Sequence, residues 1–384
     1  MLVEKYIENS LLKILARKNI GLHEPKFNNK DLENVKKCVK STFVSSAGKF
    51  IDQFEKKLKK ITGSKFVIAT NSGTSALHIA LKVVGVQENS CVIVSPLSFV
   101  ASVNAIRYNN SDPIFLDCEK DNFSLSPSIL KDFLINQTYR KKEGVFFKKN
   151  RKKISAILVP HVFGASAKID ELIKISKNYK IPVVEDSAES LGCYYNKTHL
   201  GTHGNIGVLS FNGNKIVTTG SGGAILTNSK KLYKECLHLV KVAKKKHLWE
   251  FNHDRVGYNY RISNLSSSLG CAQLDRFNLT LIKKKLLHEK YKKYFQNNKY
   301  FTFIDFDQID NLASNYWLNG IVLNKKYKKE KILNYLNKKG FYCRPAWKIL
   351  CDLKPFKKFH KYKIKNAYEL EKQLIFLPSS PDLV

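Results

Sequence analysis

The sequence predicts an α/β protein, with a mostly parallel sheet in a large domain and a smaller C-terminal α+β domain. Two observations support this prediction. Between about residues 50 and 230, short apolar runs typical of buried strands alternate with stretches of helical periodicity. After about residue 255 the alternation stops, and a long helical stretch leads into short strands. Strands that alternate with crossover helices form parallel sheets covered on both faces, so ligands are expected at the carboxyl ends of the strands.

The large domain is predicted to span residues 1–255. A helix is expected over residues 50–61, where four apolar side chains recur at helical spacing. Two further helices are expected, one from Thr74 and one over residues 168–179. The buried strands are expected at residues 66–69, 91–94, 114–116, 157–159, 183–184 and 208–211.

Residues 137–153 interrupt this alternation with a polar and basic stretch around Val145, Phe146 and Phe147. We interpret the stretch as a surface hairpin inserted into the large domain. An arm that binds nucleic acid is the less favoured interpretation.

The smaller domain is predicted to span residues 256–384. Its expected elements are a long helix over 274–295, strands near 301–306 and 318–323, and a helix over 331–339. At the other end of the chain, Ile7, Leu11, Ile14 and Leu15 predict an amphipathic helix in an N-terminal extension. This helix is expected to pack on its own domain or on a partner subunit, and docking on another partner or a membrane is the alternative.

The charge of the chain raises the question of a polyanionic partner. Its 384 residues include 66 Lys and Arg against 32 Asp and Glu, which gives a formal net charge of +34. Only eight of the basic residues are arginines, whereas surfaces that read bases favour the bidentate guanidinium group. Scattered lysines indicate a solvated surface, so no nucleic-acid partner is expected, although the positive field would help to recruit a phosphorylated small molecule.

The expected compartment is the cytoplasm. No apolar stretch is long enough to span a bilayer, and the first residues lack the basic-then-apolar order of a signal peptide. The eight cysteines include no CxxC pair, so neither a disulfide framework nor a metal site is predicted.

Four segments that follow apolar runs carry candidate site residues. The first, residues 71–77, places a glycine and hydroxyl side chains before a helix, where free backbone N–H groups suit a phosphate. A serine or threonine here is equally well explained as a helix N-cap. The second places Phe99 just beyond a strand, where its ring can stack on a flat ligand. As one of 23 phenylalanines, Phe99 is also explained as a core residue.

The other two segments carry charge. Asp186 ends a buried strand, where an ionised carboxylate requires a cation or several donors. An aspartate that caps the following helix is the alternative. Lys215 lies between an apolar strand and a glycine-rich turn, unlike nearly every other lysine of the chain. A lysine partly desolvated in a pocket can form a Schiff base with an aldehyde, although a lysine in such a turn is more often a surface residue.

Taken together, the four segments offer what pyridoxal phosphate requires. They supply backbone N–H groups for its phosphate, an aromatic side chain that can stack on its ring, a carboxylate for its pyridinium nitrogen and an amine for its aldehyde. The combination favours an enzyme that uses this cofactor.

The same segments resemble the DegT/DnrJ/StrS family of pyridoxal-phosphate-dependent sugar aminotransferases. The resemblance is carried above all by residues 184–192, 209–215 and 220–223. It extends over nearly all of residues 20–380 and is greatest for the legionaminic-acid branch, which shares the segment 22–25 and the basic hairpin near residue 150. The resemblance implies a fold-type-I aminotransferase that forms a homodimer with both active sites at the subunit interface.

The resemblance also implies roles for individual residues. Lys215 is expected to be the catalytic residue, because it bonds to the cofactor and, once released as an amine, carries a proton. Asp186 is expected to keep the ring nitrogen protonated, Phe99 to stack on the ring, and Glu189 to lie near the 3-hydroxyl group. The expected phosphate-site residues are Gly73, Thr74, Ser75 and Ser210. Asn259 is expected to reach the phosphate of the other subunit.

Two further residues are candidate substrate contacts. Arg344 is expected to meet the substrate's anion or the donor's carboxylate, and an interdomain salt bridge is an equally supported alternative. His161 directly follows Pro160, where related proteins often place another residue between the two.

The implied reaction transfers the amino group of L-glutamate to the C4 keto group of a nucleotide-linked 4-keto-6-deoxy-N-acetylglucosamine. Such a product leads to legionaminic acid or bacillosamine in surface glycans. A lysine at position 215 argues against the dehydratases of the family, which carry histidine there. Alternatives are an enzyme for 3-keto sugars, a perosamine-type enzyme and a non-catalytic basic binding protein on the same fold. The sequence leaves the choice between UDP and GDP open.

Overall fold

The strands of the main sheet follow the apolar runs of the sequence. They are β1 (Phe66–Thr70), β2 (Ser90–Val94), β3 (Asp112–Leu116), β4 (Thr138–Lys141), β5 (Gly144–Phe147), β6 (Lys153–Pro160), β7 (Val183–Asp186), β10 (Ile206–Ser210), β11 (Gly223–Thr227) and β16 (His360–Tyr362). All six predicted strands are present. Two others, β11 and β16, were not predicted.

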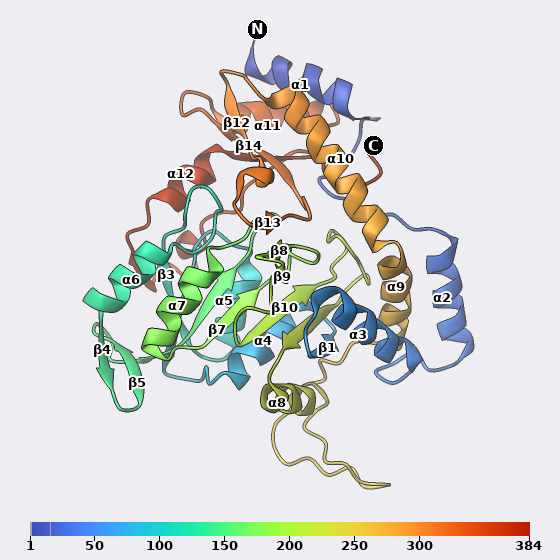
Figure 1. Cartoon of the computed structure of the whole chain (residues 1–384), viewed down its shortest axis with the longest axis vertical. Coiled ribbons are helices and arrows are strands. Elements are labelled where there is room, and N and C mark those ends of the chain that lie inside the picture. Colours follow the sequence, from blue (N-terminus) through green and yellow to red (C-terminus); the bar gives the residue numbers. More distant parts are fainter. Residues whose placement is uncertain (1, 16) are drawn as a thin grey trace.

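In the computed structural model, which describes residues 2–15 and 17–384, these strands form one ten-stranded sheet (Figure 1). Met1 and Ala16, which fall within the predicted large domain, lie outside the described residues. The strand order is β1-β11-β10-β7-β6-β2-β3-β16. All pairs from β10 to β16 are parallel, whereas β11 pairs antiparallel with β1 and β10. The predicted α/β fold with a mostly parallel sheet is confirmed.

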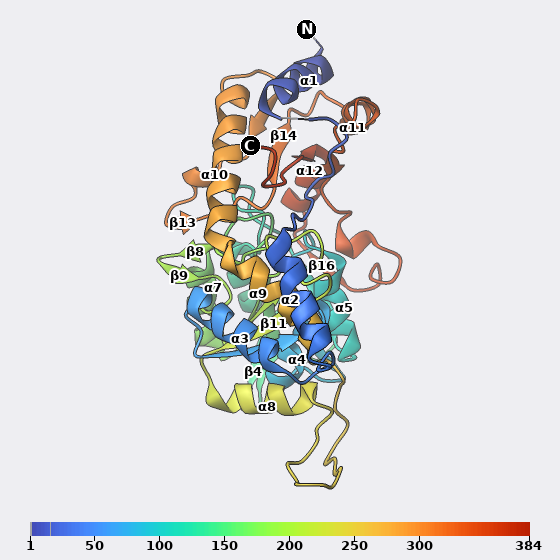
Figure 2. The same cartoon turned by 90° about the vertical axis from the view of Figure 1, so that its right-hand side faces the viewer.

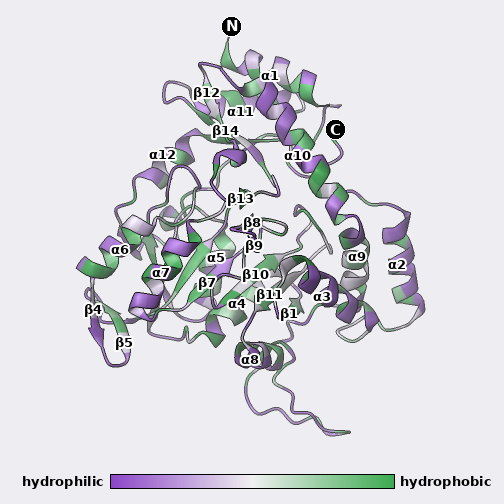
Figure 3. Ribbon diagram, in the orientation of Figure 1, coloured by the Kyte–Doolittle hydropathy of each residue, from purple (hydrophilic) through white to green (hydrophobic). Residues whose placement is uncertain are grey.

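Helices cover both faces of this sheet. They are α3 (Lys49–Thr62), α4 (Gly73–Val83), α5 (Val100–Tyr108), α6 (Pro127–Asn136), α7 (Ile169–Tyr179) and α8 (Lys230–Val240). Along β2, Val92 and Val94 belong to the core that includes α4 and α5, whereas Cys91 and Ile93 belong to the core that includes α6 and α7. This alternation is what a strand buried on both faces requires. Figure 3 shows the strands as mainly hydrophobic and the outer helices as mixed.

The basic stretch at residues 137–153 forms the hairpin β4-β5, which pairs with β6 through Phe146 and Lys153. The interpretation as an inserted surface hairpin is confirmed. The Arg140 guanidinium lies over the ring of Tyr179, 4.2 Å from its centroid, and this contact fixes the hairpin against α7.

Residues after about 276, apart from β16, build a smaller part above the main sheet (Figure 1). A four-stranded antiparallel sheet runs in the order β12 (Phe301–Phe303), β14 (Asn319–Leu323), β17 (Leu374–Leu377) and β15 (Arg344–Pro345). Helices α10 (Phe277–Phe295), α11 (Lys329–Lys338) and α12 (Asn366–Gln373) complete it. A third, small sheet joins β13 (Leu312–Ala313) of this part to β8 (Tyr194–Tyr195) and β9 (Thr198–His199).

The helix predicted over residues 274–295 is mainly one helix over 277–295, and its first two residues belong to the preceding helix. Helix α9 (Asn264–Asp275) ends just before Arg276, and α10 begins just after it. Arg276 departs from helical geometry at ψ 13°, and its guanidinium pairs at 2.6 Å with buried Asp31 of α2 (Asn29–Lys40). This ion pair ties the junction to another helix.

The predicted N-terminal helix is α1 (Val3–Ile14), and it packs on its own chain. Ile7, Leu11 and Ile14 share a core with Leu287 of α10 and Leu336 of α11, at the top of the view in Figure 1. The N-terminal extension therefore packs on the smaller part of the chain, although the sequence analysis places it in the large domain. The domain boundary at residues 255 and 256 stays a prediction.

A long arm, residues 241–259, leaves the body below α8 in both Figure 1 and Figure 2. Four apolar side chains of the arm are strongly exposed: Leu248 by 91%, Trp249 by 74%, Phe251 by 76% and Val256 by 81%. Such a concentration of exposed apolar groups on a projecting segment marks an interaction surface.

Within the described residues, no helix combines the length and the apolar character that a bilayer-spanning segment needs. All eight cysteines are buried free thiols.

Candidate active site

A cavity of about 850 Å³ opens at the carboxyl ends of the parallel strands. It is lined by residues at and after the ends of β6, β7 and β10, by the turns before α4 and α5, and by Trp317 and Trp347 of the later part of the chain. The predicted residues that line the cavity are Gly73, Thr74, Phe99, His161, Asp186, Glu189, Ser210, Lys215 and Arg344. Ser75 and Asn259 are not among the lining residues.

The start of helix α4 forms an anion site. Ser72 caps the helix: its Oγ accepts the N–H of Ser75 at 3.0 Å and lies 2.8 Å from Ser75 Oγ. The N-cap explanation is therefore correct for Ser72. A Cβ on Gly73 would lie 2.9 Å from Cβ of Ser210, so only glycine lets the helix start this close to β10. The first N–H groups of α4 and the hydroxyls of Thr74 and Ser210 then meet at the cavity, an arrangement that suits a phosphate.

Asp186 ends strand β7 and is buried. Its Oδ2 accepts a 2.6 Å hydrogen bond from the Ser102 hydroxyl, and its Oδ1 accepts the N–H of Ala188 at 3.2 Å. Burial raises the pKa of Asp186, while these hydrogen bonds and the charge of Lys215 oppose the rise. A protonated ring nitrogen is the kind of partner that such a carboxylate requires.

Lys215 lies in the turn after β10, and its main-chain N–H donates to Asn212 O at 3.0 Å. The side chain reaches into the cavity, where Nζ lies 3.1 Å from Glu189 Oε1. Glu189 Oε2 accepts the N–H of Phe163 at 2.8 Å. Burial raises the pKa of Glu189, and the positive charge of Lys215 opposes the rise. The amine and the carboxylate form a buried polar pair at the sheet edge.

Phe99 precedes α5 and is 52% exposed. Its ring centroid lies 6.0 Å from that of Trp347, across the cavity mouth. The alternative that Phe99 is a core residue is therefore wrong, because half of this side chain remains available to a ligand.

His161 lines the cavity, but both of its ring nitrogens are hydrogen-bonded within the protein. Nε2 lies 3.0 Å from buried Glu185 Oε2, and Nδ1 accepts the N–H of Ala167 at 3.2 Å. Because Nδ1 is an acceptor, the ring proton lies on Nε2 and is donated to Glu185. A substrate contact by His161 stays a prediction and would require one of these bonds to open.

Arg344 lies on β15 at the cavity rim and is exposed. Its Nη1 donates to Asn337 Oδ1 at 2.9 Å and to Cys343 O at 3.3 Å. Over residues 2–15 and 17–384 it forms no ion pair, so the alternative of an interdomain salt bridge is not found. Its guanidinium is free to meet an anion.

Sequence patterns missed two residues of the site. Ser102 lies inside α5 and donates to Asp186 at the end of β7, a contact between residues 84 positions apart in the chain. Trp317 precedes β14, and the Nζ of Lys215 lies 4.1 Å from its ring centroid. Neither residue stands in a local motif, so no signal in the sequence identifies them.

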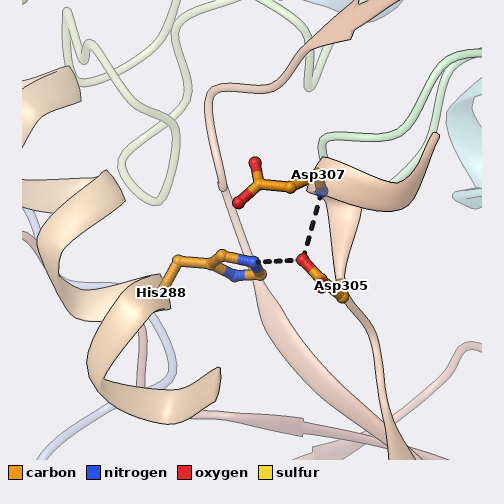
Figure 4. Close-up of side chains that lie close together, drawn as sticks. All are labelled: His288, Asp305 and Asp307. Atoms are coloured by element: carbon orange, nitrogen blue, oxygen red, sulfur yellow. Dashed lines mark hydrogen bonds and ion pairs between the residues drawn. The ribbon is translucent and has the colours of Figure 1, made fainter. Parts of the chain in front are cut away.

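A second polar cluster lies outside the cavity lining (Figure 4). His288 Nε2 lies 3.4 Å from Asp305, and Asp307 stands nearby. Lys292 Nζ pairs with Asp305 at 2.8 Å, and the Tyr316 hydroxyl donates to Asp307 at 2.6 Å. Both carboxylates are already partnered, so the cluster is explained as packing within the smaller part of the chain.

The cavity fits pyridoxal phosphate on the chemistry of its side chains. The anion site at α4 matches the phosphate, the buried carboxylate of Asp186 matches a protonated ring nitrogen, and the amine of Lys215 stands in the same cavity. The exposed face of Phe99 adds a surface on which an aromatic ring can stack.

Comparison with known proteins gives independent support. The chain matches the model of the DegT/DnrJ/EryC1/StrS aminotransferase family over residues 25–384. It is 32% identical over 367 residues to a GDP-perosamine synthase from Escherichia coli, covering 95% of this chain and 94% of that protein. It is 28% identical over 361 residues to a UDP-4-amino-4,6-dideoxy-N-acetyl-β-L-altrosamine transaminase from Campylobacter jejuni, covering 92% of this chain and 90% of that protein.

Among solved structures, the fold is similar to that of Helicobacter pylori PseC, an aminotransferase involved in the biosynthesis of pseudaminic acid. The TM-score is 0.86 at 24% identity, over 96% of this chain and 95% of that one. The expected fold-type-I aminotransferase architecture is therefore confirmed. With the family match covering nearly the whole sequence, the chain belongs to the DegT/DnrJ/EryC1/StrS family of aminotransferases, which use pyridoxal phosphate as their cofactor.

Proposed function

We propose that this aminotransferase moves the amino group of L-glutamate to the C4 keto group of a nucleotide-linked 4-keto-6-deoxy-N-acetylglucosamine. The observation that carries the proposal is the 3.1 Å contact between Lys215 Nζ and Glu189 Oε1, in the cavity that also holds Asp186 and the anion site. Relatives named for amino-sugar nucleotides support the substrate class.

Each cavity residue then has a task. When bound, pyridoxal phosphate supplies an electron sink that stabilises negative charge on the carbon losing its proton. Lys215 takes that proton and returns it two atoms away, in a 1,3-proton shift, acting as general base and then general acid. Asp186 holds a proton on the ring nitrogen, and Phe99 stacks on the ring. The phosphate is held at Gly73, Thr74 and Ser210, whereas a contact from Ser75, which does not line the cavity and pairs with Ser72, stays a prediction.

The rim of the cavity suits a nucleotide diphosphate. Exposed Arg344 and Lys348 line the cavity with buried Lys329 and with Glu330 and Glu371, and Lys329 and Lys348 both pair with Glu371, at 3.4 and 3.2 Å. Arginine and lysine side chains beside a cavity attract a diphosphate group. The positive field of the whole chain strengthens this attraction.

The active form is proposed to be a homodimer. The arm exposes the apolar side chains of Leu248, Trp249 and Phe251. Asn259, at the base of the arm, is also exposed, and its main-chain O accepts a hydrogen bond from Asn71 Nδ2 at 3.3 Å. Packing of the arm on a second subunit would bury the apolar tip and bring Asn259 of the partner subunit to the phosphate site. The division into domains at residues 255 and 256, and a cytoplasmic location in keeping with eight free thiols, belong to the same proposal.

The pathway of the product is proposed to be legionaminic-acid or bacillosamine biosynthesis. A perosamine-type reaction is the second candidate, and the 32% identity to a GDP-perosamine synthase favours it. The two candidates differ in whether the keto sugar carries an N-acetyl group.

A direct assay separates these candidates. The enzyme loaded with pyridoxal phosphate is incubated with glutamate and, in turn, with 4-keto-6-deoxy-N-acetylglucosamine linked to UDP or GDP, with GDP-4-keto-6-deoxymannose, and with a 3-keto isomer. New amino sugar is detected by mass. Amination of an N-acetylated 4-keto sugar supports the proposal, amination of the mannose derivative alone supports the perosamine-type reaction, and amination of the 3-keto isomer alone refutes both. Lys215→Ala is the control and should yield no product.

A further inference from the structure

Lys215 is held from two sides. The carboxylate of Glu189 lies 3.1 Å from Nζ, and the ring centroid of Trp317 lies 4.1 Å from the same atom. The side chain of Lys215 is only 13% exposed and that of Glu189 only 6%. In this position an ammonium group gains both an ion pair and a cation–π contact while it is shielded from water.

Asn315 fixes the two sides relative to each other. It is fully buried, and its Nδ2 donates to the main-chain O of Glu189 at 2.9 Å. Its Oδ1 accepts the N–H of Trp317 at 2.9 Å. One amide side chain therefore spans the segment after β7 and the segment before β14.

Trp317 is fixed twice more. Its indole Nε1 donates at 2.9 Å to the main-chain O of Asn214, the residue before Lys215. Its own main-chain O accepts at 2.8 Å from Nζ of Lys284, a buried lysine on α10. The smaller part of the chain thus places an indole ring directly over the amine of the larger part.

We propose that Glu189 and Trp317 form a dock for the amine of Lys215 whenever that amine is not bonded to the cofactor, and that Glu189 takes its proton before it attacks. This inference rests on the proposed role of Lys215 as the reacting amine. Glu189 touches the reacting group, whereas Asn315 is a positioning residue that holds the dock together.

The proton step balances without any other reactant. The Lys215 ammonium donates along its hydrogen bond to Glu189 Oε1, which yields a neutral amine and a neutral carboxylic acid. Burial favours neutral groups over a charged pair, and burial raises the pKa of Glu189 in that direction. The neutral amine then has the lone pair that attack on an aldehyde requires.

The test follows the loading of pyridoxal phosphate into the apoenzyme by absorbance, in wild type and in Glu189→Gln, between pH 6 and pH 10. The glutamine keeps an oxygen for the Phe163 N–H but cannot take a proton. We expect Glu189→Gln to load at least about tenfold more slowly near neutral pH, with the deficit shrinking at high pH, where hydroxide can take the proton in place of Glu189. A deficit that is constant with pH would indicate a purely structural role and overturn the proton step.

The ring of the dock is tested with Trp317→Phe and Trp317→Leu. Phenylalanine keeps a ring that holds the amine beside Glu189, so its loading rate should stay within a few-fold of wild type, whereas leucine leaves the amine unpositioned and should lose about tenfold. Trp347→Leu is the matched control, because Trp347 lies in the same cavity but stacks on Phe163, with ring centroids 4.8 Å apart. It should leave the pH dependence of loading unchanged, and equal losses in Trp317→Phe and Trp317→Leu would exclude the aromatic contact.

Two outcomes separate the dock from the proposed function. If Lys215→Ala still loads the cofactor covalently and turns over, the proposed function fails and the dock with it. If Lys215 is essential but the pH dependence of loading is the same in wild type and Glu189→Gln, only the dock fails. Thermal unfolding of each variant verifies that the fold is intact.

Discussion

The hydroxyl of Ser102 donates a 2.6 Å hydrogen bond to Oδ2 of Asp186. Ser102 belongs to α5 and Asp186 to the end of β7, so the bond joins a covering helix to the strand edge at the cavity. Ser102 in turn lies 3.0 Å from the hydroxyl of Ser98. A short chain of hydroxyl groups therefore supports the carboxylate that is proposed to hold the ring nitrogen.

Removal of the Ser102 hydroxyl should destabilise the ionised form of the Asp186 carboxyl group. The Ser102 bond holds the pKa of Asp186 down against the effect of burial, so Ser102→Ala should raise that pKa. Activity that needs ionised Asp186 should then fail earlier on acidification, with the acid limb of the pH–rate profile moved to higher pH. Ser98→Ala, which leaves the bond to Asp186 in place, is the matched control. An acid limb that does not move would contradict the role of Ser102.

Without cofactor, the buried carboxylate of Asp186 should cost stability. Burial raises its pKa, so the folded state binds the proton more tightly than the unfolded chain. The stability that comes from the protonated form is present below the unfolded pKa, near 4, and is lost as the pH rises through the raised folded pKa. Asp186→Asn should therefore stabilise the apoenzyme at pH 7, by on the order of 1 kcal/mol per unit of pKa shift, but not near pH 3. Chemical denaturation at the two pH values measures this, and an equal effect at both would exclude the titration of Asp186 as its cause.

Most of the main sheet could be predicted from the sequence, because a parallel strand that is buried on both faces consists of a short run of apolar residues. Asp186 and Lys215 could be found for the same reason, since Asp186 ends such a strand and Lys215 lies in the turn after another. The short strand β16 could not, because its three residues carry no apolar run and pair with β3 across more than 200 residues of chain.

The support of the site depends on tertiary contacts. Ser102, Asn315 and Trp317 reach the site through a helix face or a loop that packs there, and a local pattern does not encode such contacts. The position of α1 is a similar case, because its apolar stripe gives the helix but not the surface that covers it.

The close approach of α4 to β10 should make Gly73 sensitive to substitution. In Gly73→Ala the new Cβ would lie 2.9 Å from Cβ of Ser210 and 3.4 Å from Leu209 O, so the start of the helix has to shift at the anion site. We expect the affinity for pyridoxal phosphate to fall by about tenfold or more, because the N–H groups no longer aim at one point. Gly213→Ala is the control, since a Cβ there meets nothing within 4 Å. Cofactor titration by absorbance gives both affinities, and equal affinities for the two variants would argue against the anion site.

The anion met by Arg344 can be identified from steady-state kinetics. Its guanidinium is exposed at the rim and, within the described part of the chain, bonds only to neutral partners, Asn337 and Cys343 O. If it meets the diphosphate, Arg344→Ala should raise KM for the nucleotide sugar about tenfold or more at nearly constant kcat, without changing KM for glutamate. A rise in KM for glutamate alone would assign Arg344 to the donor carboxylate. Arg140→Ala, on the hairpin β4-β5, removes the same charge away from the cavity and should change neither constant.

Sharing of active sites between subunits can be tested by mixing two inactive variants. Lys215→Ala lacks the reacting amine, and Asn259→Ala lacks the group proposed to reach the phosphate site of the other subunit. If each site combines Lys215 of one subunit with Asn259 of its partner, a heterodimer of the two variants has one intact site and one site that lacks both groups. After unfolding and refolding of an equal mixture, half of the dimers are mixed, so about a quarter of wild-type activity should return. Each variant treated alone should stay inactive. No recovery from a mixture that forms dimers by light scattering would place Asn259 in the site of its own subunit or outside the reaction, because only exchange between subunits can restore an intact pair.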